Sequence, residues 1–328
     1  MAGVRILGTG SFFPEKVLTN ADLEKIVDTS DEWITARTGI KERHIAGDAQ
    51  ATSDLALEAA KRAIADSGIS PGDVDAVIVA TVTPDMMFPA TACLVQNGLG
   101  LKGCACFDLS AACSGFIYSM ACARGLIQSG MYRTVLAAGA ETLSRITDWK
   151  DRNTCVLFGD GAGAMVMQAA DGESDILSVY LGADGSYKDI LNQPGGGSRT
   201  PIRKENADMG LQYLHMEGKE VFKVAVTKMV ESVRKGLELC GKSTRDLALL
   251  IPHQANLRII KAIGERLDID KGRIYVNLHK YGNISAASNI AALDEARREG
   301  RVKAGELVEL VAFGGGLTWA SAVLRMPR

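Results

Sequence analysis

Cys113 is the residue whose type and position best suit covalent chemistry. It stands in DLSAACSGFIYSM (108–120), between a strand-like run and a helix-like run. A cysteine at the start of a helix meets unpaired backbone N–H groups and the positive end of the helix dipole, which favour the thiolate. Cysteine is also a common core residue, so packing is the alternative. The position favours a nucleophile of lowered pKa at Cys113, whereas the other cysteines are expected to stay reduced and to pack.

Two more polar residues follow predicted strands. His253 comes after a strand at 247–251 in IPHQAN, and Asn283 comes after an expected strand at 274–278 in KYGNIS. In open α/β sheets the active site lies beyond the carboxyl ends of the strands. Taken alone, His253 suits packing and ligand binding equally, and Asn283 suits a turn better than a catalytic role. Convergence with Cys113 requires that the two halves of the chain pack about a pseudo-twofold axis.

A repeated order of elements indicates such halves. A helix at 52–67 precedes a buried strand, and a helix at 220–240 precedes another at 245–256. Three further pairs of segments match in order: CFDLSAACSG with YVNLHKYGNISAAS, TVLAAGAE with LVELVAFGGG, and GDGAGAMVM with GGGLTWASAVL. In the last pair the glycines are expected to form tight turns before a strand. One of them, Gly316, would donate its N–H beside that of Cys113 to an oxyanion if the two tips face each other.

The pattern predicts an α/β protein of two similar halves, 1–172 and 173–328, joined at the polar break AADGESD. Continuous apolar strands favour two mostly parallel sheets covered by helices. The polar, glycine-rich insertion at about 182–218 is too long for a plain connection, which predicts a functional loop or lid.

Composition and charge exclude several classes of binding partner. The chain of 328 residues has 37 Lys and Arg against 39 Asp and Glu, so there is no global basic field for nucleic acid or an anionic membrane. No apolar run suits a bilayer span, and the N-terminus is expected to be a strand and a glycine turn rather than a signal peptide, which predicts a cytoplasmic protein. The glycine clusters lack the GK[ST] ending of a phosphate loop, and the cysteines lack metal-ligand spacing.

Motifs along the whole chain are similar to those of one family. They are SDEWITARTGIKER (30–43), DLSAACSGF (108–116), DRNTCVLFGDGAGA (151–164), MEGKEVFKVAV (216–226), PHQANLRII (252–260), YGNISAAS (281–288) and FGGGLTWASAVL (313–324). Together they resemble the thiolase-like condensing enzymes, specifically the β-ketoacyl-acyl-carrier-protein synthase III family. The resemblance implies a duplicated, layered α-β-α-β-α fold and a Cys-His-Asn triad at Cys113, His253 and Asn283.

The resemblance also implies a reaction. Cys113 would take an acyl group from acyl-coenzyme A, with acetyl-CoA as the expected primer, and malonyl-acyl carrier protein would attack the thioester as it loses CO2. Since decarboxylation supplies the carbanion, His253 and Asn283 need only donate hydrogen bonds to the enolate oxygen. Coenzyme A enters as a substrate thioester, and neither a cofactor nor a metal is implied.

Binding residues are implied in the same way. The coenzyme A adenine would lie between Trp33 and Arg152, with Arg37 near the phosphates and Asn256 lining the pantetheine tunnel. Phe88 would reach into the acyl pocket of the neighbouring subunit of a homodimer. The acidic carrier protein would meet Lys223 and Arg258. To this pair we add Lys261, one helical turn from Arg258, although charges on a helix more often form a solvated face.

Two residues depart from the family pattern, and other families are alternatives to be weighed. Ile284 stands where relatives more often have threonine, and His279 is unusual, so both are expected to adjust the position of Asn283. A thiolase would need a second reactive cysteine near the C-terminus, and elongating synthases use a second histidine. Plant-type polyketide synthases and hydroxymethylglutaryl-CoA synthase fit the triad but not the SDEWI and HQANLR segments. The main alternative is a synthase III relative that makes a secondary metabolite or signal, followed by a non-catalytic acyl-binding subunit.

Overall fold

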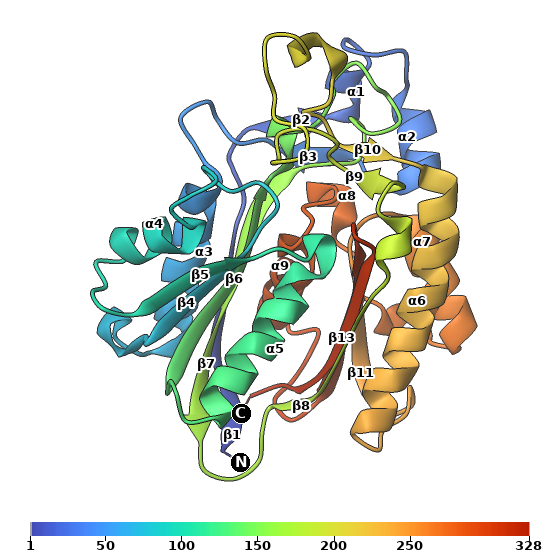
Figure 1. Cartoon of the computed structure of the whole chain (residues 1–328). Helices are drawn as coiled ribbons and strands as arrows, with labels where there is room; N and C mark the ends of the chain where they lie inside the picture. The colour runs from blue at the N-terminus through green and yellow to red at the C-terminus, as the bar shows by residue number, and fades with distance from the viewer. Residues whose placement is uncertain (1, 328) are drawn as a thin grey trace.

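The computed structural model describes residues 2–327, and within them two large sheets carry most of the strands (Figure 1). The first sheet has the order β1-β7-β6-β4-β5 and the second the order β11-β12-β13-β8. Their bounds are β1 Gly3–Phe12, β4 Ala76–Ala80, β5 Ala105–Leu109, β6 Thr134–Thr142 and β7 Asp160–Ala170, then β8 Ile176–Ala183, β11 Leu247–Pro252, β12 Leu307–Gly314 and β13 Thr318–Arg325. Residues 3–170 thus build one sheet and residues 176–325 the other.

The two sheets share one plan. In the first, β4 and β6 are parallel, β6 and β7 antiparallel, and β7 and β1 antiparallel. In the second, β11 and β12 are parallel, β12 and β13 antiparallel, and β13 and β8 antiparallel. Strands β8, β11, β12 and β13 therefore repeat β1, β4, β6 and β7 in order and direction, which is the duplicated arrangement that the sequence predicted.

Helices complete the layers. They are α3 Thr52–Ser67, α4 Thr91–Gly98, α5 Gly115–Gln128, α6 Gly218–Leu239, α7 Leu257–Leu267 and α9 Ala287–Arg298. Helices α3 and α4 pack on the outer face of the first sheet, α5 and α9 contact both sheets between them, and α6 covers the second sheet with α7 beside it (Figure 1). The order of layers is α-β-α-β-α, as expected.

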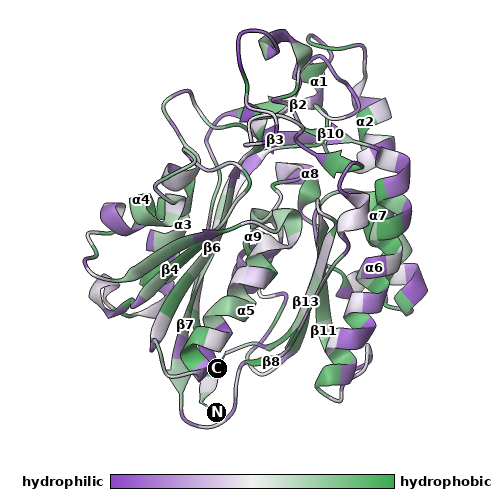
Figure 2. Ribbon diagram, in the orientation of Figure 1, coloured by the Kyte–Doolittle hydropathy of each residue, from purple (hydrophilic) through white to green (hydrophobic). Residues whose placement is uncertain are grey.

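Burial explains why these segments fold as they do. Every residue of β4 and β6 is buried, so these strands are apolar on both faces rather than alternating. Figure 2 shows hydrophobic strands in both sheets and mostly hydrophilic loops around α1 (Asn20–Leu23), β2 (Val17–Thr19) and β3 (Glu42–His44). Helix α6 buries one face, including Val221, Val226, Met229 and Val233, while its lysines stay on the other.

Three sequence expectations were wrong. The sheets are mixed rather than mostly parallel, because β1, β7, β8 and β13 run antiparallel to their neighbours. Residues 274–278 form no strand; Ile274 makes an isolated parallel bridge to Leu250, and α8 (Leu278–Tyr281) follows. Gly161 and Gly163 lie inside β7 rather than in a turn before it. At Gly163 a Cβ atom would come within 2.5 Å of Ile290 on α9, so a glycine is needed for helix-to-strand contact.

Gly139, in the middle of β6, sets the distance between the first sheet and the segment that enters α9. A Cβ atom there would lie 2.5 Å from the carbonyl oxygen of Ala286 and 2.8 Å from its carbonyl carbon. These are backbone atoms, which cannot move aside as a flexible side chain can. Glycine at this position therefore allows the second half of the chain to rest on the strand that carries Glu141 and leads to the site.

We predict that Gly139→Ala destabilises the fold by roughly 1–3 kcal/mol, the usual cost of overpacking a filled interior. The matched control is Gly125→Ala, since Gly125 lies in α5 and a Cβ atom there would meet nothing within 4 Å. That change should be neutral or stabilising by up to about 1 kcal/mol, as for an exposed helical glycine. Urea denaturation measures both; equal effects of the two substitutions would contradict the close contact at Gly139.

Candidate active site

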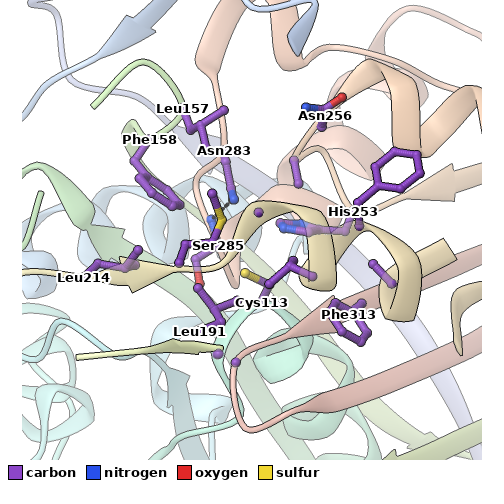
Figure 3. Close-up of a pocket in the computed structure, with 18 of the residues that line it drawn as sticks. Cys113, Leu157, Phe158, Leu191, Leu214, His253, Asn256, Asn283, Ser285 and Phe313 are labelled. Carbon is purple, nitrogen blue, oxygen red and sulfur yellow. Dashed lines mark hydrogen bonds between the residues drawn. The ribbon is translucent and has the colours of Figure 1, made fainter. Parts of the chain in front are cut away.

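One cavity of about 1140 Å³ brings the predicted reactive residues together (Figure 3). Cys113, His253 and Asn283 all line it, and so does Gly316. The small strands β9 (Leu191–Asn192) and β10 (His215–Met216), which belong to the predicted insertion, line it as well. The convergence that the sequence made conditional on the packing of two halves is thus present in the structure.

Cys113 lies on a tight turn between β5 and α5. Ala112, just before it, has a φ of 45°, a left-handed conformation that side-chain-bearing residues rarely adopt, and residues Ala112–Ser114 form a single 3-10 turn that runs into α5. At Gly314, at the end of β12, a Cβ atom would lie 2.5 Å from the Cys113 nitrogen. The second sheet therefore presses directly on the backbone of the cysteine and fixes where its side chain points.

The expected lowering of the Cys113 pKa is wrong for this structure. Burial raises the pKa of the Cys113 thiol to about 12, and the buried Glu141 carboxyl group raises it too, whereas the Ser285 hydroxyl lowers it. Desolvation of the charged form outweighs the favourable position before α5. The sequence showed the helix start but not how strongly the surrounding protein would desolvate the thiol.

His253 follows β11 directly, and its backbone N–H donates to the Val311 carbonyl at 2.7 Å. The side chain is 4% exposed, and neither Nδ1 nor Nε2 has a hydrogen-bond partner among residues 2–327. Burial lowers its pKa to about 3. The imidazole is therefore neutral at physiological pH, with one N–H to donate and one nitrogen to accept.

Hydrogen bonds from both its backbone N–H and its backbone carbonyl hold Asn283 in place. Its N–H donates to the Leu157 carbonyl at 2.8 Å, and its carbonyl accepts from Gly159 at 3.0 Å. Its side-chain Oδ1 accepts the N–H of Ser285 at 2.8 Å. Since that oxygen is engaged, the amide N–H groups are the part of the side chain left to donate to a bound molecule.

Trp33 and Arg37, two of the residues expected to bind coenzyme A, line the cavity, but Arg152 does not. The guanidinium groups of Arg37 and Arg152 stand 4.5 and 4.7 Å from the Trp33 ring centroid. Arg152 also donates to the Asp28 carbonyl at 2.6 Å and does not line the cavity. Its direct contact with Trp33 leaves no room for an adenine between the two side chains, so such a sandwich requires Arg152 to move away from Trp33.

Other predicted residues are distributed as follows. Asn256 lines the cavity, and its side-chain oxygen caps α7 by accepting from the Arg258 N–H at 2.8 Å. Lys223 and Arg258 line the mouth, whereas Lys261 is exposed on α7 outside it. Phe88 is 84% exposed on the loop before α4 and does not reach the cavity of its own chain.

The two unusual residues lie outside the cavity lining. Ile284 is buried with Phe13 and Tyr281, on the opposite side of the loop from the pocket. His279 sits in α8, where its carbonyl accepts the N–H of Lys41 at 3.1 Å. Any effect of either residue on Asn283 must therefore pass through the backbone of the loop.

Sequence reasoning missed four residues. Gln254 joins the end of β11 to the segment 275–278: its amide nitrogen donates to Pro252 and Tyr275, and its oxygen accepts from Asn277 and Leu278. Lys219 adds a cation to the cavity lining. Ser285 and Glu141 are buried beside Cys113. Gln254 directly follows His253, and Ser285 lies two residues after Asn283, so closeness in sequence to a predicted site residue was the available signal. Nothing in the sequence singles out Glu141.

Membrane spans and metal clusters are absent from the described part of the chain. No helix among residues 2–327 is long and apolar enough to cross a membrane. Over the same range, no three His, Cys, Asp or Glu side chains are grouped so as to hold a metal ion.

A duplicated α-β-α-β-α fold with one pocket between the strand tips of its halves defines a thiolase-like protein. Comparison with known families is specific within that class. The family described as 3-oxoacyl-[acyl-carrier-protein] synthase III matches residues 107–185, and its C-terminal counterpart matches residues 237–326. A β-ketoacyl-[acyl-carrier-protein] synthase III of Caldanaerobacter subterraneus subsp. tengcongensis is 58% identical over 98% of this chain and 97% of its own length.

Solved structures agree. The 3-oxoacyl-[acyl-carrier-protein] synthase III of Aquifex aeolicus has a TM-score of 0.91 and 50% identity, covering 98% of this chain and all of its own. The priming β-ketosynthase of the R1128 polyketide pathway has a TM-score of 0.92 at 34% identity, covering 99% of this chain and 97% of its own. The chain belongs to the 3-oxoacyl-[acyl-carrier-protein] synthase III family, for which β-ketoacyl is the other common name.

The low pKa of His253 has a consequence for stability. Between pH 6.5 and about 3 the unfolded chain binds a proton at this residue that the folded chain excludes. Acidification through this window therefore destabilises the fold, and stability rises again with pH. We predict that His253→Gln loses this part of the pH dependence of the free energy of unfolding.

Nitrogen NMR of histidine-labelled protein tests the same point directly. The His253 signals should remain those of a neutral ring from pH 8 down to pH 5. Protonation with a midpoint near 6.5 would contradict the desolvated position of the ring.

Proposed function

We propose that this protein is a β-ketoacyl-[acyl-carrier-protein] synthase III, an acyltransferase that starts fatty-acid synthesis. It would condense an acyl-CoA primer, acetyl-CoA in the first instance, with malonyl-acyl carrier protein to give a 3-ketoacyl-acyl carrier protein, CoA and CO2. The observation that carries the proposal is that Cys113, His253 and Asn283 line one pocket, in a chain 58% identical to a synthase of that name.

The first half-reaction loads the enzyme. The Cys113 thiolate attacks the carbonyl carbon of the acyl-CoA thioester, the bond from that carbon to the coenzyme A sulfur breaks, and CoA leaves with a proton. The N–H groups of Cys113 and Gly316 would hold the oxyanion formed on the way. In an enclosed pocket such donors stabilise developing charge far more than they do in water.

The second half-reaction forms the carbon–carbon bond. Malonyl-acyl carrier protein loses CO2, and the electron pair left on its α-carbon attacks the acyl group on Cys113, which frees the thiolate. A neutral His253 and the amide of Asn283 would donate to the enolate oxygen that appears during decarboxylation. No carboxylate base is needed for this step, because breaking the carbon–carbon bond to CO2 supplies the carbanion.

Cationic side chains at the cavity support coenzyme A and the carrier protein as binding partners. Arg37, Lys219, Lys223 and Arg258 give the cavity mouth a cationic lining that suits the phosphates of coenzyme A and an acidic carrier protein. We assign carrier-protein contact to Lys223, Arg258 and Lys261, and coenzyme A contact to Trp33, Arg37, Arg152 and Asn256. Neither a cofactor nor a metal enters the scheme.

The remaining assignments concern the assembly. Phe88, exposed with Met86 and Met87, would enter the acyl pocket of a second subunit in a homodimer. The halves 1–172 and 173–328 would be the units of the ancestral duplication, and the cytoplasm the place of action. A specialised role outside fatty-acid synthesis has less support, since the R1128 priming enzyme is 34% identical against 58% for the fatty-acid relative.

Mass spectrometry after mixing with acetyl-CoA tests the proposal. An acetyl group should appear on the peptide that contains Cys113 and should be absent in Cys113→Ala. Cys122→Ala is the matched control, because that cysteine lies on α5 outside the cavity lining and its loss should leave the adduct in place. Absence of an adduct with every short acyl-CoA in a primer panel would rule out the synthase activity.

Variants of the donor pair separate the two half-reactions. His253→Ala and Asn283→Ala should still be acylated at Cys113 but should release CO2 from malonyl-acyl carrier protein at least about a hundredfold more slowly, as expected when an oxyanion donor is removed. Labelled CO2 release and the acyl adduct are measured on the same sample. Normal decarboxylation in both variants would contradict the assigned donor role.

A further inference from the structure

Glu141 is a buried carboxyl group that the proposed chemistry does not use. It lies near the end of β6, it has no exposed surface, and three neighbours donate to it. Thr83 donates at 2.6 Å and Thr81 at 3.1 Å, both to Oε2, which also accepts the Val82 N–H at 3.1 Å. Oε1 accepts only a longer, shared bond from the same N–H at 3.3 Å. One carboxyl oxygen is therefore saturated and the other has capacity to accept another proton donor.

Ser285 lies beside Cys113, and it directly precedes Ala286, which contacts β6 at Gly139, two residues before Glu141. Its hydroxyl acts on the pKa of both Cys113 and Glu141, lowering each, and Figure 3 shows its side chain beside Cys113 at the pocket wall. The hydroxyl is buried and makes no hydrogen bond of normal geometry within residues 2–327. A buried hydroxyl without a partner is costly, so its placement calls for an explanation.

The backbone at Ser285 supports a functional role for the hydroxyl. Its φ is 45°, a left-handed conformation that is unfavourable for serine, and Asn283 Oδ1 accepts its N–H. Strained residues of this kind persist where the surrounding structure fixes them, and they concentrate at functional sites. In this conformation Ser285 lines the pocket wall beside Cys113 (Figure 3).

We propose that Glu141, acting through the Ser285 hydroxyl, accepts the proton that Cys113 must lose before it is acylated. The thiol proton moves to the serine oxygen as the serine proton moves to Oε1 of Glu141, so the products are a thiolate, an unchanged serine and a neutral carboxylic acid. When the primer thioester breaks, the same proton can return by this route to the departing thiolate of CoA. Glu141 is thus a positioning residue that acts on the nucleophile through Ser285.

Charge repulsion favours this route over loss of the thiol proton to water. Because the pKa of the thiol is higher than that of Glu141, the thiolate is a minor species that acylation consumes. Burial raises the pKa of Glu141 to about 7, so near neutral pH the carboxyl group can both accept and return a proton. Cys113 from the turn before α5 is the titratable group that faces it, with the hydroxyls of Thr81, Thr83 and Ser285 from the neighbouring segments. A thiolate beside a carboxylate would be repelled, whereas proton transfer leaves the pair with a single negative charge.

The rate of Cys113 alkylation by iodoacetamide, followed by mass spectrometry from pH 5 to 10, tests this inference. Glu141→Gln keeps the shape of the side chain but cannot accept the proton, so alkylation at pH 7 should fall about tenfold or more and should reach the rate of the unsubstituted protein at pH 7 only at a higher pH. Ser285→Ala should have the same effect, and the double variant should be no slower than the slower single one, because both residues serve one route.

The matched control is Glu309→Gln, since Glu309 is also fully buried but lies in β12 away from the cavity lining. It should leave the alkylation profile unchanged. Equal or faster alkylation in Glu141→Gln would overturn the inference, because it would mean that the carboxylate only repels the thiolate. A normal profile in Ser285→Ala would also overturn it, even if Glu141→Gln did not fold.

The inference rests on the proposed function only in taking Cys113 as the nucleophile. Iodoacetamide needs neither acyl-CoA nor carrier protein. Failure to form an acyl adduct with the primers would therefore overturn the synthase activity and leave the alkylation result standing.

Discussion

Backbone-to-backbone contact between the two halves is the constraint on which the site depends. It occurs where glycine leaves room: at Gly139 against Ala286, at Gly159 against the carbonyl of Tyr281, and at Gly314 against the nitrogen of Cys113. Main-chain atoms are held by strands and turns and have far less freedom than side chains, so these contacts fix the loop of Asn283 and the turn of Cys113 relative to each other. The cavity lies between these two segments and is lined by residues of both.

The same enclosure gives the site its electrostatic character. Desolvation raises the pKa of Cys113 and Glu141 and lowers that of His253, so the groups around the sulfur favour their neutral forms. An environment that penalises charge suits a reaction whose carbanion comes from loss of CO2 and not from a strong base. It also makes donors aimed at a developing oxyanion valuable, because little water competes with them.

The sequence predicted the helices at 52–67 and 220–240, the order of the repeated elements, and Cys113 and His253 after strands, because each depends on local periodicity or on a turn. Asn283 lines the same pocket, but the strand expected before it does not form. The sequence did not predict the antiparallel strands, since apolar strands such as β7 and β13 have the same sequence pattern whether they run parallel or antiparallel to their neighbours. It also missed the partners that act from a distance. Glu141 is only another residue of a buried strand until Thr81, Thr83 and Ser285 are folded around it, and the enclosure that reverses the expected pKa shift of Cys113 comes from both halves.

The duplication explains how one backbone plan supplies two chemical tasks. Each half has a turn before its central helix with a non-glycine residue at a φ of 45°, Ala112 before α5 and Ser285 before α9. In the first half the next residue is Cys113, and in the second it is Ala286. The second half therefore has no thiol at this turn. It has the Ser285 hydroxyl one position earlier, where the first half has the Ala112 methyl group. Because the two turns line the same pocket, divergence at these positions is enough to put a thiol on one side and a hydroxyl on the other.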